Sequence, residues 1–148
     1  MSAPEQIVIT EHSRKKMLNA VALVEASLCK LSPYDETHVY NADESEPYDA
    51  LSDRFVRAVE ICLKFFRSYK RIQFAEESDT LRDQLNRMEK PEIISSVELW
   101  FKMRDVRNRI VHDCLPHEIK QMYDDVMGPF GAELKSCTVK VQELIFGR

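Results

Sequence analysis

Three polar residues of the second half of the chain, Arg107, Asn108 and His112, have types and spacing that suit phosphodiester chemistry. Asn108 and His112 are four residues apart, so they lie on one face of a helix. Arg107 lies about 140° around the helix axis from His112, so it must reach around the helix or come from a second copy of the chain. Histidine transfers protons near neutral pH and guanidinium binds phosphate, so together they supply what metal-free cleavage requires.

The same segment also has a simpler interpretation. His112 lies near the end of the predicted helix, where the helix dipole stabilises a positive charge. The neighbouring arginines could pair with Asp105 and Asp113. In that case the segment is an ordinary charged helix end, and the residue types alone leave both interpretations open.

The elements that must position these residues are predicted to be helices. The 148-residue chain has only three glycines, all after residue 127, which excludes glycine-rich phosphate loops and argues against many tight hairpin turns. Apolar residues recur at helical spacing along most of the chain. We therefore predict an all-α fold, a single up-down bundle of about five helices over residues 1–148, with 1–12 and 33–49 irregular.

The predicted boundaries follow from proline, capping residues and apolar seams. The second helix is expected from about residue 50 into the low seventies, and a shorter helix near Asp79–Met88 with Asp79 as its cap. The fourth is expected after a cap at Ser95 or Ser96, with Trp100 in the core. Gly128-Pro129 should break or kink the last helical stretch. In the fourth helix, two arginines occupy positions of the expected apolar seam, which favours a symmetric dimer through that helix. The seam of the second helix is Leu51, Phe55, Val59, Cys62, Phe66 and Tyr69.

Basic residues are concentrated in two segments of a chain whose net charge is −4. Such clusters permit a local phosphate-binding surface on an acidic protein. Glu60, an acid within the first segment, is expected to pair with Lys64, and the alternative is a carboxylate that faces the site. The arginines that we expect to contact RNA are Arg54, Arg57, Arg104 and Arg109.

Cysteine spacing and hydropathy exclude several other classes. The four cysteines form no Cys-x-x-Cys pair, so we expect no metal site and no cofactor, and three of the thiols should be core side chains. No apolar run approaches the ~20 residues of a membrane span, and the first residues lack the apolar stretch of a signal peptide. The sequence therefore predicts a soluble, cytoplasmic protein.

Two stretches resemble a known family. The segment from Glu98-Leu99-Trp100 through Arg107-Asn108 to His112, together with residues 53–60, is similar to HEPN-domain proteins of the nucleotidyltransferase substrate-binding-like and HepT-type toxin group. The resemblance covers roughly residues 13–145. It implies a five-helix bundle that dimerises with its motifs facing across a cleft, and metal-independent endoribonuclease activity in active members. On this basis Arg107 and His112 would be catalytic, and Asn108 would orient the site.

The resemblance also implies a toxin–antitoxin pair in which a minimal nucleotidyltransferase serves as the antitoxin. In HepT-type toxins that partner modifies a tyrosine two positions after the histidine, and here Cys114 occupies that position. We therefore expect control by binding or through another residue, and Tyr123 is the nearest tyrosine. The expected partners are a second copy of the chain, the nucleotidyltransferase and RNA. The alternative function is a noncatalytic binding partner of the nucleotidyltransferase.

Overall fold

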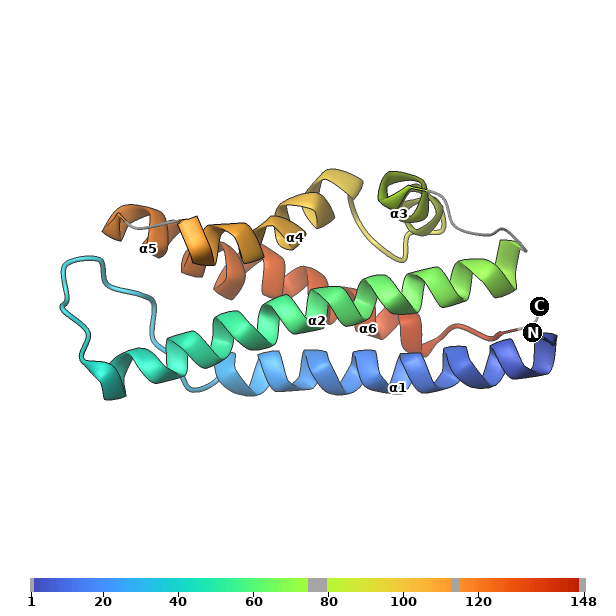
Figure 1. The fold of residues 1–148 in the computed structure, drawn as a ribbon, viewed down its shortest axis with the longest axis horizontal. Helices are drawn as coiled ribbons and strands as arrows, with labels where there is room; N and C mark the ends of the chain where they lie inside the picture. Colours follow the sequence, from blue (N-terminus) through green and yellow to red (C-terminus); the bar gives the residue numbers. More distant parts are fainter. Residues whose placement is uncertain (1, 75–79, 113–114, 147–148) are drawn as a thin grey trace.

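The computed structural model describes residues 2–74, 80–112 and 115–146, and these residues form helices and connecting segments without strands. The all-α bundle is thus confirmed (Figure 1). Helices α1 and α2 form a long antiparallel hairpin, α4 packs on α2, and α6 packs on α1. Helix α3 is short and is seen end-on in Figure 1. The elements are α1 (Ala3–Leu28), α2 (Ala42–Phe74), α3 (Leu81–Glu89), α4 (Val97–His112), α5 (Pro116–Asp125), the π-helical segment η1 (Val126–Phe130) and α6 (Gly131–Gln142).

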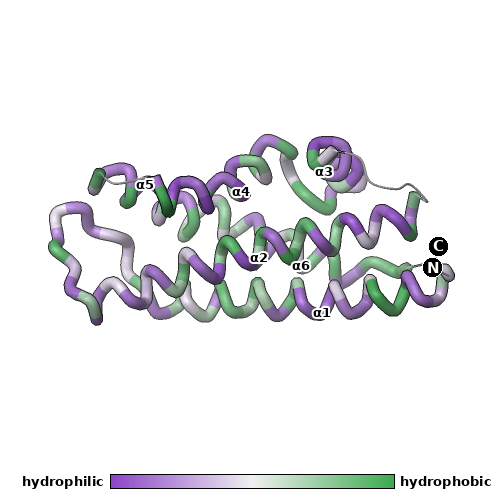
Figure 2. The backbone as a smooth tube through the Cα atoms, in the orientation of Figure 1, coloured by the Kyte–Doolittle hydropathy of each residue, from purple (hydrophilic) through white to green (hydrophobic). Residues whose placement is uncertain are grey.

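The core is one cluster of apolar side chains from all the helices. Figure 2 shows apolar and polar residues mixed along each helix, as expected when one side is buried and the other faces water. Every residue of the predicted α2 seam is buried. No helix within residues 2–74, 80–112 and 115–146 is long and apolar enough to cross a bilayer.

The prediction of an irregular segment at residues 1–12 was wrong, because α1 begins at Ala3. The backbone N–H of Glu5 donates to Ser2 Oγ over 3.4 Å, which caps the helix. Pro4 lies in the first turn, where a proline costs no internal hydrogen bond. The β-branched residues that follow are thus in a helix.

The prediction of an irregular segment at 33–49 was wrong in its second half, because α2 begins at Ala42. Asn41 and Glu44 cap this helix reciprocally: Glu44 N–H donates to Asn41 Oδ1 over 2.8 Å, and Asn41 N–H donates to Glu44 Oε1 over 3.2 Å. Pro47 lies inside the helix, in its second turn, and costs α2 one internal hydrogen bond. The acidic residues of this stretch therefore belong partly to a helix.

The starts of α3 and α4 have side-chain caps. Thr80 forms a capping box with Asp83 at the start of α3. Asp79, the cap that we predicted there, lies outside the described residues. At the start of α4, Leu99 N–H donates to Ser96 Oγ over 3.2 Å, which confirms one of the two predicted caps.

The final helical stretch is kinked at Gly128, as predicted, and continues through η1 into α6. Gly131 is needed for this wide turn, since a Cβ atom there would lie 2.8 Å from the carbonyl oxygen of Val126. With α5, η1 and α6 counted as one kinked helix, the bundle has the expected five helices.

A buried carboxylate fixes the start of α4 to α6. Glu133 accepts from the Ser95 backbone N–H over 3.0 Å, from Ser95 Oγ over 2.7 Å and from Trp100 Nε1 over 2.8 Å. Trp100 is fully buried, which confirms its predicted place in the core. The helix that carries the candidate site is therefore held at its amino-terminal half.

Candidate functional site

A pocket of about 460 Å³ lies between α2 and α4 and contains part of the predicted constellation. Arg104, Arg107 and Asn108 line it from α4, and Glu60 faces them from α2. The complete lining is Val56, Val59, Glu60, Phe101, Met103, Arg104, Asp105, Arg107 and Asn108. The pocket therefore combines two guanidinium groups with carboxylates on an apolar floor.

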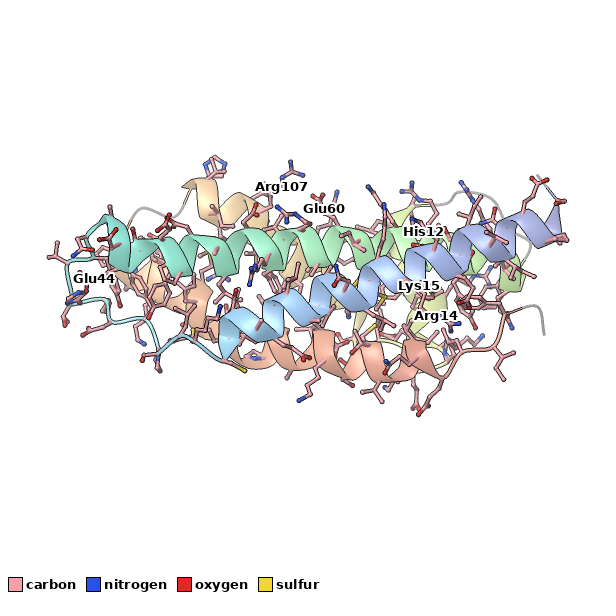
Figure 3. All side chains as sticks on the ribbon, turned by 90° about the horizontal axis from the view of Figure 1, so that it is seen from below. His12, Arg14, Lys15, Glu44, Glu60 and Arg107 are labelled. Atoms are coloured by element: carbon pink, nitrogen blue, oxygen red, sulfur yellow. The ribbon has the colours of Figure 1, made fainter. Side chains whose placement is uncertain are left out.

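The central contact of this site is an ion pair between the two helices. Arg107 Nη1 lies 2.7 Å from Glu60 Oε1, and Figure 3 shows the two side chains next to each other. Glu60 thus pairs with Arg107 and not with Lys64, so of our two interpretations the carboxylate that faces the site is correct. The side chains are 69% and 47% exposed, so a phosphate in the pocket could compete for the guanidinium.

The prediction that two arginines occupy the apolar seam of α4 was wrong. The buried residues of α4 are Val97, Trp100, Met103 and Val106, each three residues after the last. Because three residues are less than one helical turn of 3.6, the buried side shifts gradually around α4. As a result Val106 is fully buried and Arg107 is exposed. The seam therefore gives no argument for a dimer.

The remaining two members of the motif lie toward the end of α4. Asn108 Nδ2 donates to Asp105 Oδ1 over 2.9 Å, and this bond holds the side-chain amide of Asn108 at the pocket wall. His112 is exposed, is the last residue of α4 and is not among the lining residues of this pocket. The structure thus brings Arg107 and Asn108 into one pocket and leaves His112 about one helical turn beyond Asn108.

Two of the four arginines predicted to bind RNA lie at the pocket or its edge. Arg104 lines the pocket and is exposed. Arg57 is also exposed, and its Nη2 lies 2.7 Å from Asp53 Oδ2 one turn earlier in α2. Both guanidinium groups are accessible to a ligand in solution.

The other two arginines have structural partners. Arg54 Nη1 donates to Ser27 Oγ over 2.8 Å and to the Leu23 carbonyl over 3.1 Å, which ties α2 to α1. Arg109 Nη1 lies 2.9 Å from Asp125 Oδ2 in a largely buried pair that ties α4 to α5. Sequence spacing gave no sign of these long-range partners.

A second open pocket, of about 560 Å³, continues the groove toward the end of α4. It shares Val56, Glu60 and Arg107 with the first pocket. Ile110 and Val111 contribute apolar surface here, with exposed fractions of 40% and 74%. The groove thus runs past Arg107 to an exposed apolar patch.

Other candidate reactive groups are buried or outside the described residues. Burial raises the pKa of the Cys62 and Cys137 thiols, and both are core side chains as predicted, whereas Cys29 is exposed. Cys114 lies outside the described residues. Tyr123 is only 5% exposed, and burial raises its pKa to about 12, so it is a poor acceptor for nucleotide transfer.

The described residues contain no group of three side chains suited to hold a metal ion. His117, in the first turn of α5, is exposed. Comparison with known proteins found no family model that matches the chain, and no significantly similar curated protein or solved structure. The resemblance to HEPN-domain proteins therefore stays a prediction from residues 53–60 and 98–112.

Proposed function

We propose that this protein is a HepT-like toxin, a metal-independent endoribonuclease of the HEPN type that acts as a dimer. The observation that carries the proposal is the pocket between α2 and α4, whose wall holds Arg107 and Asn108. His112 follows on the same helix and is open to solvent. A guanidinium in the groove and an accessible imidazole at the end of the same helix are the groups that acid–base cleavage of RNA requires.

The proposed reaction is an internal transfer. His112 accepts the proton of a ribose 2′-hydroxyl as its oxygen attacks the adjacent phosphorus, and Arg107 stabilises the extra negative charge of the phosphorane. The bond from phosphorus to the 5′-oxygen then breaks, that oxygen takes a proton from water, and His112 returns its proton to the hydroxide that is left. The products are a 2′,3′-cyclic phosphate and a 5′-hydroxyl, and no metal ion is consumed or required.

The proposed dimer places the end of α4 against its counterpart in the second copy. Support comes from the exposed Ile110 and Val111 beside the groove, which a partner would cover. A second copy could also bring its own Arg107 closer to His112 than one helix allows. Light scattering at micromolar concentration should give the mass of a dimer, and a monomer would contradict this part of the proposal.

The test is cleavage of RNA by purified protein in excess chelator. We expect His112→Ala and Arg107→Ala to lower the rate by about 10²–10⁴-fold, because each removes a group that acts in the transition state. Both residues are exposed, so circular dichroism and the melting temperature should stay nearly unchanged.

His117→Ala is the matched control, because it removes another exposed histidine outside the groove. It should retain the wild-type rate. Cleavage that survives His112→Ala, or wild-type dimer that leaves RNA intact in every buffer, would contradict the proposed activity.

The ion pair of Arg107 with Glu60 favours a second candidate, a noncatalytic partner of a minimal nucleotidyltransferase. In that case the pair is a structural contact that links α2 to α4. Coexpression with the neighbouring transferase followed by intact-mass measurement distinguishes the two functions. A stable complex of unmodified chain that leaves RNA intact would support the binding partner. Nucleotide-sized mass additions at Cys114 would contradict control by binding alone.

A further inference from the structure

A straight stripe of charged residues runs along the exposed side of α2. Its members follow one another at intervals of four and three residues, so all lie within one narrow sector of the helix. Its first half is neutralised, because Arg57 pairs with Asp53 and Glu60 pairs with Arg107. The members are Asp53, Arg57, Glu60, Lys64, Arg67 and Arg71, all exposed.

The second half of this stripe is purely basic. Lys64, Arg67 and Arg71 follow Glu60 toward the end of α2, and residues 61–74 contain no Asp or Glu. None of the three cations forms a salt bridge with another residue that the structure describes. The positive charges of these three exposed side chains are therefore available to an anionic partner.

We propose that Lys64, Arg67 and Arg71 form a track for the sugar–phosphate backbone of single-stranded RNA that leaves the groove beside Glu60 and Arg107. This inference rests on the proposed function and names the part of the substrate outside the cleft. The rise of α2 from Lys64 to Arg71 is about 10 Å at 1.5 Å per residue. A stacked strand advances about 3.4 Å per nucleotide, so the track spans about three nucleotides.

The composition of this surface favours a nucleic-acid backbone over a protein. Among the described residues, the large exposed apolar side chains are Val8, Ile9, Leu23, Val39, Ile110, Val111, Leu115, Val139 and Ile145, and none of them belongs to α2. Protein interfaces are depleted in charge and enriched in aromatic residues at their centre, whereas binding to phosphates uses Lys and Arg almost alone. The track therefore has the chemistry of a phosphate contact without base readout.

The experiment measures binding separately from cleavage. Wild-type protein and Lys64→Gln/Arg67→Gln/Arg71→Gln are titrated with 2′-O-methyl RNA of about twelve nucleotides, which lacks the attacking hydroxyl, over about 50 to 300 mM NaCl. Loss of three contacts to a single strand should reduce the slope of log K against log salt by about 2. A strand of about three nucleotides, short enough to occupy only the groove, should show a much smaller difference.

The matched control is Lys30→Gln/Lys90→Gln/Lys135→Gln, which changes the net charge equally at exposed lysines on other elements. Equal loss of binding in both triple variants would mean general attraction and would overturn the track. Absence of wild-type binding at low salt, or equal competition by polyglutamate, would also overturn it. Binding with the expected slopes by a protein that cleaves no RNA would support the track and contradict the nuclease.

Discussion

The ion pair that occupies Arg107 makes a specific prediction for Glu60→Gln. Glutamine keeps the shape of the side chain and removes the charge that holds the guanidinium. With side chains 69% and 47% exposed, the pair is worth about 0.2–1 kcal/mol. An RNA phosphate must displace Glu60 to reach Arg107, so its removal should raise kcat/KM by up to about fivefold. The unfolding free energy should fall by no more than about 1 kcal/mol.

The assay is initial-rate cleavage of a short RNA in chelator, with NaCl raised stepwise. The advantage of Glu60→Gln should shrink at high salt, because screening weakens the competing pair in the wild type. Glu98→Gln is the matched control, since it breaks the exposed ion pair with Arg82 at 2.8 Å, and neither residue lines the groove. A tenfold loss of kcat with a changed pH profile would refute this reasoning and give Glu60 a role in the chemistry. An unchanged kcat/KM at low salt would also refute it.

Two further predictions concern the core. Glu133→Ala should lower the unfolding free energy by about 2–5 kcal/mol in urea, because it orphans the buried Trp100 Nε1 and the backbone N–H of Ser95. Glu133→Gln should lower the unfolding free energy by less. A decrease below about 1 kcal/mol for Glu133→Ala would contradict the view that Glu133 holds α4 to α6. Burial raises the pKa of both Tyr48 and Tyr123 to about 12. Since the folded state retains protons that the unfolded state releases near 10, stability should fall as pH rises from about 10 to 12, measured by unfolding with tyrosinate absorbance.

The fold was predictable where one side of a helix is continuously apolar. The α2 seam repeats at four and three residues, and each member is buried. Prediction failed at helix starts, where short-range contacts decide: Ser2 caps α1 and Asn41 caps α2. In both places a proline and mixed composition resembled a loop, although proline suits the first turn of α1 and costs α2 a single internal hydrogen bond.

The candidate site was predictable only in part. The α4 residues stand out by type and spacing, and Arg107 and Asn108 do share a pocket. The partner of Arg107 is 47 residues away in the chain, and the local Lys64 offered a simpler pair for Glu60. The available signal was that Glu60 is an isolated acid in a basic stretch. The partners of Arg54 and Arg109 depend on how helices cross, which local periodicity does not specify.

Because Glu133 holds the first turns of α4 to α6, any change in the tilt of α4 displaces the opposite end of that helix most. The helix is fastened to α6 at Ser95 and Trp100, whereas His112 lies twelve residues beyond Trp100, about 18 Å along the axis. Near His112, α4 is held to α5 by the Arg109–Asp125 pair. If that pair opened, a tilt of α4 by about 5° around the Glu133 contacts would move His112 by about 1.6 Å, enough to separate a proton acceptor from a hydroxyl. A mutation at Glu133, or a partner that breaks the Arg109–Asp125 pair, could therefore change the site without touching any residue that lines the groove.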